Sequence, residues 1–441
     1  MTTFKPSGLG WADNIPAHWD VAKVCLVARL ESGHTPSRLH PEYWLPDECT
    51  IPWLSLGDVW QLRAGIREYL GETKEKISPL GMANSAARLL PAGTVVLSRT
   101  ASVGFTGIMP EAMATTQDFA NWVCGPRLLP EFLLYAFRGM ADEFERMMMG
   151  STHQTIYMPD IRRLAIPVPP REEQSGIVQH LRRRLPKIDA LIAKKERLIE
   201  LLQEKRQALI TQAVTKGLDP NVPMKESGVE WLREIPTHWV VNKLRRISNR
   251  VDVGIAEAAT HAYAEAGVPI VRSTNVANNR FDAEHLLFIA PWFAEKNRSK
   301  YLFAGDLVTV RTGNAGVTAV VPLHLDRSQC FTLLMTTLRA QHTPEFFCYL
   351  LNCAAGRTYF ALESWGTAQL NISVPILGNM KVAVPPPGEQ ANIVKWLKGR
   401  LQRLDRTLTS VETQTDRLRE YRQALITAAV TGKIDVSSEA A

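Results

Sequence analysis

The chain repeats its own sequence, and this duplication constrains its fold more than any other feature. Residues 15–19 (IPAHW) return as residues 235–239 (IPTHW), and residues 206–211 (RQALIT) return unchanged as residues 422–427. Further matched pairs lie between them: 8–11 with 228–231, 92–100 with 304–312, and 168–174 with 384–390. The offsets of 212 to 220 residues are far beyond the roughly 20–50 residues of solenoid repeats. We therefore predict two whole units in tandem, able to fold with internal pseudo-two-fold symmetry.

Each unit has the same order of segments. A polar lead-in precedes a region of mixed patterning, which holds strand-like runs (93–98 and 306–310) and helical stretches (130–149 and 344–362). A proline-rich stop and a long helical stretch follow. We predict α/β (α+β) globular domains, two in tandem, joined by two long helices. The expected boundaries are 1–170 and 218–386 for the globular domains, and 171–217 and 387–441 for the helical parts.

Each long helical stretch has a heptad pattern. The first runs from Arg171 to Gly217 and the second from Gly388 to Gly432, and prolines precede both starts. Apolar residues alternate in steps of four and three, which is typical of a coiled-coil seam. The apolar seam positions are Leu181, Leu185, Ile188, Ile192, Ile199, Leu202 and Leu209, and then Leu397, Leu401, Leu404, Leu408, Val411, Leu418 and Leu425. Polar interruptions fall at Lys195, Arg206, Thr415 and Arg422.

The two seams align without a gap at an offset of 216 residues. We therefore predict that the helices pack on each other as an antiparallel coiled coil, rather than each packing on its own domain. About 30 helical residues span on the order of 45 Å, which exceeds the roughly 34 Å of one DNA turn. Such a pair would hold two domains at a fixed separation. Pro186 departs from the pattern, so we predict a kink or break near Leu185 and a separate short helix over 171–185.

Composition narrows the class of protein. Hydrophobic residues make up 45% and charged residues 22%, which is ordinary for a soluble globular chain. No apolar run approaches the roughly 18 residues of a membrane span, and no signal peptide is evident, so we expect a cytoplasmic protein. The six cysteines form no CxxC pair, so we expect free thiols and no metal site.

The basic charge is unevenly distributed. The net charge is +7, from 51 Lys and Arg against 44 Asp and Glu. Residues 171–217 hold eleven basic and six acidic residues, and residues 387–433 hold nine and five. The two helical parts therefore have a net positive charge that exceeds the net charge of the whole chain, so the remaining residues are slightly acidic overall. Any contact of the globular domains with nucleic acid must come from local clusters.

The order of these motifs resembles the DNA-specificity (S) subunit of type I restriction–modification systems. IPxHW, a domain, VPPxxEQ, a long helix and RQALITxAVT occur twice, and the resemblance covers essentially the whole chain. It implies two target recognition domains, each reading one half of a bipartite site in double-stranded DNA. It also implies that the helices set the spacer and dock two modification (methylase) subunits, which restriction (translocase–nuclease) subunits join. S-adenosylmethionine, ATP and Mg would belong to these partners, and this chain would not be catalytic.

Polar residues in loops are the candidates for DNA contact, because such side chains read base edges and bind phosphates. In the first domain they are Gly33, His34, Thr35, Ser37, Ser55, Asp58, Arg99, Thr100, Ser102, Thr152, His153 and Gln154. In the second they are Arg272, Thr274, Asn275, Arg311, Thr312, Asn314, Thr367, Gln369 and Asn371. Simple turns, helix caps and solvated arginines remain the structural alternatives. Arg99 and Arg311 each follow a strand-like run, so we expect each at a strand end.

Two other classes of function stay open. The sequence has no Asn-Pro-Pro-aromatic methylase motif and no GxxxxGK[ST] loop. A nuclease-like string does occur, with Pro46-Asp47 followed by Glu72-Thr73-Lys74, but the second unit has no equivalent. The alternatives are therefore a divergent DNA nuclease and a coiled-coil scaffold that does not bind DNA. Both units keep the His-Trp pair, at residues 18–19 and 238–239, so we predict a packing role for it.

Overall fold

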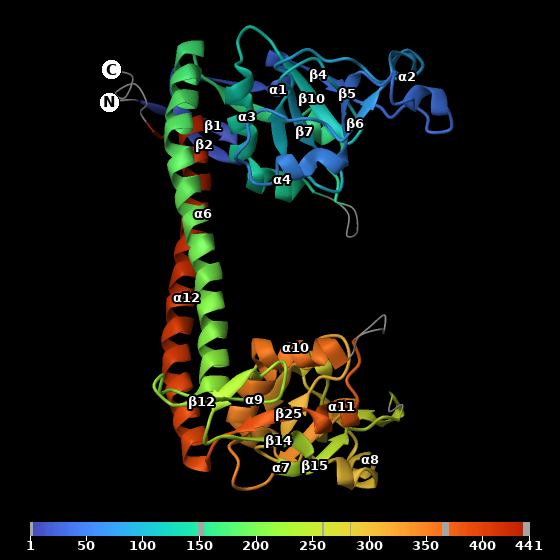
Figure 1. Cartoon of the computed structure of the whole chain (residues 1–441). Coiled ribbons are helices and arrows are strands. Elements are labelled where there is room, and N and C mark those ends of the chain that lie inside the picture. Colours follow the sequence, from blue (N-terminus) through green and yellow to red (C-terminus); the bar gives the residue numbers. More distant parts are fainter. Residues whose placement is uncertain (1–2, 149–153, 258–259, 283, 364–369, 435–441) are drawn as a thin grey trace. The chain divides into compact units, whose positions relative to one another are not determined.

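The computed structural model describes residues 3–148, 154–257, 260–282, 284–363 and 370–434. The chain divides into two compact units, residues 1–197 with 412–441 and residues 198–411 (Figure 1). Each unit contains a globular part, one half of the long helix α6 (Arg171–Lys216) and one half of the long helix α12 (Pro387–Val430). Within the described ranges, no helix is both long enough and apolar enough to cross a bilayer.

The globular part of the first unit is built on a four-stranded antiparallel sheet in the order β4-β10-β7-β8. Beside it, β5 pairs antiparallel with β6 and parallel with β9. A β1-β2 hairpin and a β3-β11 pair complete the strands. Their bounds are β1 (Phe4–Leu9), β2 (Ala12–Pro16), β3 (Asp20–Lys23), β4 (Ala28–Ser32), β5 (Ile51–Leu54), β6 (Glu75–Ile77), β7 (Val95–Ser98), β8 (Thr106–Ile108), β9 (Ala114–Thr115), β10 (Phe119–Cys124) and β11 (Ala165–Val168).

The core of the first unit lies between its main sheet and helix α3. The residues from Phe132 to Phe137 on α3 are all buried, and they pack with Trp122 of β10 in one apolar cluster. Leu181 of α6 and Ile426 of α12 join the same cluster, so the two long helices are part of this core. The helices are α1 (Val24–Val27), α2 (Pro79–Ala83), α3 (Pro130–Gly139), α4 (Ala141–Met147) and α5 (Met158–Ile161), with 3-10 turns η1 (Pro41–Trp44) and η2 (Leu56–Gln61).

The second unit repeats this plan. Its main sheet has the order β15-β24-β21-β22, and a second sheet has the order β16-β20-β17-β23. The strands are β12 (Met224–Glu226), β13 (Glu234–Pro236), β14 (Val240–Lys243), β15 (Ser248–Val253), β16 (Tyr263–Ala264), β17 (Val268–Val271), β18 (Val276–Ala277), β19 (Arg280–Phe281), β20 (Leu287–Ile289), β21 (Leu307–Thr309), β22 (Thr318–Val320), β23 (Gln329–Cys330), β24 (Leu334–Leu338) and β25 (Lys381–Val384). Pairs β12-β13, β14-β25 and β18-β19 lie outside these sheets.

Helices cover the core of the second unit as they do in the first. Phe346 and Phe347 of α9 are fully buried and share one cluster with Leu397 of α12 and Ile210 of α6. The helices are α7 (Leu244–Ile247), α8 (Pro291–Lys296), α9 (Pro344–Asn352), α10 (Ala354–Glu363) and α11 (Val374–Asn379), with 3-10 turns η3 (Thr260–Ala262), η4 (Ser273–Asn275), η5 (Arg298–Lys300) and η6 (Leu323–Leu325). The expected mixed α/β domains with two long helices are confirmed.

The predicted heptad seam of the long helices is confirmed by burial. All fourteen apolar seam residues are buried or half-buried, although solvent-exposed residues flank them on both helices. In the first unit, Asp189 pairs with Arg422 and Lys195 with Gln414, so positions rise along α6 as they fall along α12. In the second unit, Arg206 pairs with Asp405. Within each unit the paired halves therefore run antiparallel.

The predicted break at Pro186 is wrong. Helix α6 runs without interruption from Arg171 to Lys216, and Pro186 lies inside it. A proline removes one helical hydrogen bond and costs about 3 kcal/mol in a helix interior. Pro186 lies on the exposed face, where water can bind the freed carbonyl, and its neighbour Leu185 is buried in the core cluster. Packing of the adjacent turns therefore holds the helix together through the proline.

The repeated His-Trp pair fixes the start of each long helix to its own globular part, as predicted for a packing motif. In the first unit, the carboxylate of Glu173 binds His18 Nε2 and accepts a hydrogen bond from Trp19 Nε1, both at 2.8 Å. In the second unit, Glu389 binds His238 Nε2 at 2.8 Å. The glutamate of the repeated Glu-Gln dipeptide thus has a structural role in both units.

Candidate nucleic-acid interface

Arg99 lies at the end of a buried strand of the first unit, as the sequence predicted. The carbonyl of Arg99 accepts a hydrogen bond from the amide of Ile156 at 2.9 Å, and Thr100 forms an isolated bridge with Thr155. This links the end of β7 to the loop that follows α4. The Arg99 side chain donates from Nε to the carbonyl of Gln117 at 3.0 Å.

Arg311 has the same setting in the second unit. Its carbonyl accepts a hydrogen bond from the amide of Ile372 at 2.9 Å, and Thr312 bridges to Asn371. Its Nε donates to Asn371 Oδ1 at 3.1 Å. Arg311 therefore has a side-chain amide as its partner, where Arg99 has a backbone carbonyl. In both arginines the Nη groups have no partner among the residues that the structure describes.

The loops after the two arginines share one backbone path. Ala101 and Gly313 both have positive φ, at 57° and 78°. Gly104 and Gly316 follow at 86° and 87°, and a side chain at Gly316 would collide with Phe360. Glycine is the residue that adopts this region without strain, so the alanine at position 101 is held there by its surroundings. The path leaves Thr312 and Asn314 exposed, and Thr100 and Ser102 half-buried.

The polar loop after β4 is joined to Arg99 through Gln117. Thr35 Oγ1 donates to Gln117 Oε1 at 2.9 Å, while the Gln117 carbonyl accepts from Arg99. His34 and Ser37 on the same loop are exposed. The loop, Gln117 and Arg99 therefore form one continuous polar surface. Gln117 was not predicted, because nothing in its local sequence distinguishes it from an ordinary loop residue.

The structure corrects the prediction that Gly33 contacts DNA. It is buried, and a Cβ there would collide with the carbonyls of Thr115 and Thr116. The amide of the next residue, His34, donates to the Thr115 carbonyl at 2.9 Å. Gly33 thus allows two backbone segments to approach closely, which is a structural role.

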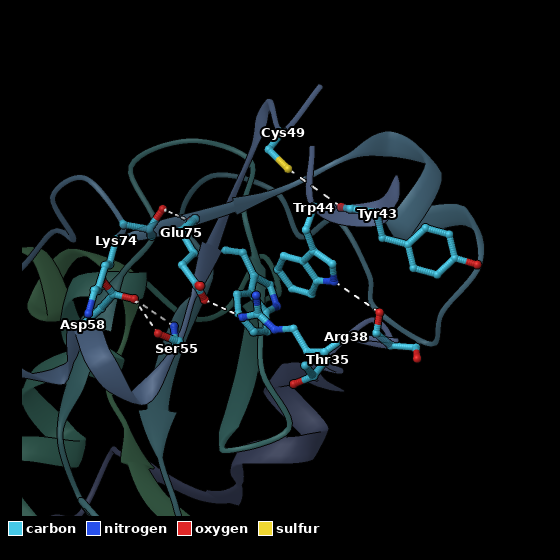
Figure 2. Close-up of polar contacts among 12 residues, drawn as sticks. Thr35, Arg38, Tyr43, Trp44, Cys49, Ser55, Asp58, Lys74 and Glu75 are labelled. Atoms are coloured by element: carbon cyan, nitrogen blue, oxygen red, sulfur yellow. Dashed lines mark hydrogen bonds and ion pairs between the residues drawn. The ribbon is translucent and has the colours of Figure 1, made fainter. Parts of the chain in front are cut away.

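Asp58 is a second correction. It is 1% exposed, and its Oδ2 accepts from both the amide and the hydroxyl of Ser55 at 3.0 Å (Figure 2). Its Oδ1 accepts from the amide of Lys74 at 2.8 Å. Both oxygens are used within the fold, so Asp58 and the Ser55 hydroxyl stabilise the η2 turn instead of reading DNA.

Asn275 has the same structural role in the second unit. It is 2% exposed, accepts from the amide of Arg272 at 3.0 Å and donates to the carbonyl of Asp282 at 3.2 Å. The neighbouring Thr274 is exposed. Arg272 is half-buried and reaches the carbonyl of His285 at 3.4 Å through Nη2. Because a buried, satisfied amide cannot reach a base edge, Asn275 is also a correction.

The remaining candidates fall around two loops. Thr152, His153, Thr367 and Gln369 lie outside the described residues. Gln154, directly after the first of these loops, is exposed, and its carbonyl accepts from the amide of Ala101 at 2.9 Å. Among the described residues, no group of three or more His, Cys, Asp or Glu side chains is arranged to hold a metal ion.

An ion pair and a hydrogen bond at Glu68 join the loop between η2 and β6 to helices α6 and α3. Glu68 accepts from Arg182 of α6, with the shortest contact at 2.6 Å, and from the hydroxyl of Tyr135 at 2.6 Å. Burial raises the pKa of Glu68, but the hydrogen bonds from Arg182 and Tyr135 outweigh it, so the net pKa lies below its usual value. Burial also lowers the pKa of Arg138 on α3 to about 10.

Comparison with known proteins agrees with this arrangement. Residues 16–201 match the family model of the type I restriction modification DNA specificity domain. The chain is 24% identical to the type I restriction enzyme MjaIX specificity subunit of Methanocaldococcus jannaschii, over 99% of this chain and 97% of that protein. It is 22% identical to the EcoKI specificity subunit of Escherichia coli, over 96% of this chain and 90% of that protein.

Solved structures share the fold. A chain of a type I restriction–modification system, solved in a study of complex assembly and conformational transition, aligns with a TM-score of 0.68 and 17% identity, covering 95% of this chain and 99% of that chain. The HsdS subunit from Thermoanaerobacter tengcongensis aligns with a TM-score of 0.52 and 16% identity, covering 95% and 98%. Residues 16–201 therefore match a type I restriction modification DNA specificity domain, and nearly the whole chain is similar to type I restriction enzyme specificity subunits.

Proposed function

We infer that this chain is the subunit that gives a type I restriction–modification enzyme its DNA specificity. It is a non-catalytic recognition subunit that works in a complex with the other subunits of that enzyme. The observation that supports this most directly is that Arg99 and Arg311 occupy equivalent positions in the two units. Each follows a strand, and the carbonyl of each accepts a hydrogen bond from a loop that lies between the recognition domain's helices and the start of a long helix. Two like domains with an arginine at the same place suit a target that is read in two parts.

Each globular domain, within residues 1–170 and 218–386, reads one half of a bipartite site in double-stranded DNA. Arg99 and the exposed side chains of the Thr35 loop face the first half-site. Arg311, Thr312 and Asn314 face the second. Arginine forks and amide side chains are the groups that pair with base edges and with phosphates, so both surfaces have suitable chemistry.

Helices α6 and α12 set the spacer between the half-sites and dock two modification subunits. Restriction subunits join that assembly in the cytoplasm, and S-adenosylmethionine, ATP and Mg are bound by these partners. The surface of the two helices supports this docking role, because exposed apolar residues lie among many basic ones. The exposed apolar residues are Leu191, Leu198, Leu201 and Tyr421. Exposed apolar surface of this kind marks sites of protein contact.

The similarity to type I restriction enzyme specificity subunits does not favour a nuclease or a scaffold without DNA binding. The nuclease-like string would need Asp47 and Glu72 to converge on a metal ion. Among the described residues, neither carboxylate belongs to a group of three or more His, Cys, Asp or Glu side chains arranged to hold a metal ion.

The test is co-expression of this chain with its modification subunit in a host free of DNA methylation, followed by methylation mapping. We expect one bipartite motif with a fixed gap. Arg99→Ala should alter only one half of the motif, and Arg311→Ala only the other half. A methylome without a bipartite motif, or one in which both variants alter the same half, would contradict the proposal.

A further inference from the structure

Arg38 forms an ordered group with two tryptophans at the edge of the first recognition domain. It lies three residues after Thr35, in the loop between β4 and β5. Its guanidinium carbon is 3.6 Å from the centre of the Trp44 ring and 5.6 Å from that of Trp53 (Figure 2). The first distance is that of a guanidinium lying against the indole, an arrangement that favours a cation.

A carboxylate fixes one edge of the same guanidinium. Arg38 Nη2 donates to Glu75 Oε2 on β6 at 2.7 Å (Figure 2). The two tryptophans are themselves held, because Trp44 Nε1 donates to the Ser37 carbonyl at 3.2 Å and Trp53 Nε1 to the His34 carbonyl at 3.3 Å. Arg38 is therefore restrained on one face and one edge, while 51% of its side chain remains exposed.

The restrained guanidinium still has donors to offer. Its Nε and Nη1 groups have no partner in the part of the chain that the structure describes. Nη2 has two hydrogens and Glu75 takes one of them, so the other can form a fork with the neighbouring Nε–H or Nη1–H. A planar fork of two N–H groups matches the O6 and N7 acceptors of guanine in the major groove. Restraint lowers the rotamer entropy that is lost when such a contact forms, so the arrangement is ready for binding.

The Glu75 carboxylate helps to decide whether the ligand of Arg38 is a base or a phosphate. A phosphate brought to Arg38 would also approach the Glu75 carboxylate, which is 39% exposed and carries the same sign of charge. A guanine edge has no formal charge, so its O6 and N7 acceptors meet a weaker repulsion from this carboxylate. An arginine that only bound phosphates would gain from the absence of this carboxylate, so its presence favours a base as the ligand.

The position of Arg38 agrees with this role. The loop that holds it is joined to Arg99 through Thr35 and Gln117, so Arg38 extends the candidate surface. In the second unit, β17 pairs parallel with β23 as β5 pairs with β9, which makes residues 255–267 the corresponding loop. That loop contains no arginine. An arginine in this loop therefore occurs only in the first domain, as expected for a residue that determines one half-site.

We propose that Arg38 reads a guanine in the half-site of the first domain, and that Trp44 and Glu75 position it for this contact. This rests on the proposed function, since it names a base and a residue for that same recognition. The second half-site is read without Arg38.

The experiment is methylation mapping with the whole chain and its modification subunit, for wild type and Arg38→Ala. In wild type, the half-site of the first domain should contain a guanine. In Arg38→Ala, sites with another base at that single position should become methylated, with discrimination reduced about 5- to 150-fold. Every other position should keep its preference.

Three further variants sharpen the result. Arg38→Lys should relax the same position, because an ammonium cannot form the planar fork. Glu75→Gln should relax that position in part, because Arg38 loses its restraint. Arg88→Ala should leave the motif unchanged, since Arg88 forms an exposed ion pair with Glu31 at 3.1 Å but is not stacked on a tryptophan. Should Arg38→Ala fail to fold, Arg38→Lys and Glu75→Gln decide the question.

Several outcomes would overturn the proposal. One is an unchanged motif in both Arg38 variants. Another is uniform loss of methylation at all sites with rescue by lysine, which indicates a phosphate contact. A wild-type half-site without guanine would also exclude it. A wild-type methylome without any bipartite motif would count against the proposed function itself, whereas a bipartite motif that ignores Arg38 would count against this inference alone.

Discussion

Arg422 of α12 donates to Asp189 of α6 at 2.6 Å, and only 14% of each side chain is exposed. Arg422 also donates to the carbonyl of Gly65 at 2.8 Å, so it joins both helices and a loop of the recognition domain. The equivalent pair in the second unit, Arg206 with Asp405, is longer at 3.4 Å and more open, with 55% of Asp405 exposed. Matched residues therefore differ in burial between the two units.

This difference predicts unequal effects of matched variants. Arg422→Ala removes the ion-pair partner of Asp189, which is only 14% exposed, so it should destabilise the first unit by about 2 to 3 kcal/mol. Arg206→Ala removes an exposed pair and should cost about 0.5 kcal/mol. Thermal unfolding of the two variants, followed by calorimetry, measures both changes. Equal losses would show that the ion pair of the first unit is no stronger than its exposed counterpart.

The hydrogen bonds of Glu173 and of its counterpart Glu389 allow a second comparison between the two units. Glu173 accepts from both His18 and Trp19, whereas for Glu389 a contact with His238 is found and Trp239 Nε1 has no partner among the described residues. Glu173→Ala should therefore cost about 2 kcal/mol and Glu389→Ala about 1 kcal/mol. Limited proteolysis of each variant should release the first recognition domain more readily than the second. Faster release of the second domain would contradict this.

The glycines that end the long helices are a third test. Gly217 and Gly432 have φ of 76° and 73°, so alanine is strained at either position. A side chain at Gly432 would also collide with the Pro16 ring and lie 2.9 Å from Trp19, while at Gly217 the nearest atom is 3.4 Å away. Gly217→Ala should therefore cost about 1 kcal/mol, and Gly432→Ala should lower the melting temperature further. Equal melting temperatures would refute the role of the clash.

The Glu68 carboxylate predicts a pH dependence. Its pKa in the folded state is below the value of about 4.3 in an unfolded chain, so it contributes stability above pH 4.3, and this contribution is lost as the pH falls through the folded value. The difference in unfolding free energy between wild type and Glu68→Gln should be constant near neutral pH and shrink below about pH 4. Denaturant titrations of both proteins across this range measure it. A difference that stays constant at acidic pH would remove Glu68 as the cause.

Repetition within the sequence was the most informative signal. Residues kept in both copies turned out to hold the frame together, as with the His-Trp pairs and the heptad seams. Arg99 and Arg311 were placed correctly at strand ends because a run of apolar residues followed by glycine is a local pattern. These features depend on residues close together in the chain, or on a period that the sequence displays directly.

The failures concern partners that lie far apart in sequence or depend on packing. The sequence predicts Asp58 and Asn275 as candidates for DNA contact, but each side chain stabilises a local turn and is buried. Pro186 was expected to end a helix, yet packing of the turns on either side keeps α6 continuous. Propensity is a weak guide where tertiary contacts supply more free energy than the local preference.

The sequence by itself determined that the protein is a duplicated unit with two heptad helices, because periodicity and repetition are properties of the chain alone. Only the tertiary structure decided which polar residues share a surface. Arg38, Trp44 and Glu75 come from a loop, a 3-10 turn and a strand, and they meet because β5 and β6 pair in one register. Gln117 joins Arg99 to Thr35 because β10, which Gln117 precedes, pairs with both β4 and β7. Such contacts follow from strand pairing across distant segments, which no local pattern specifies.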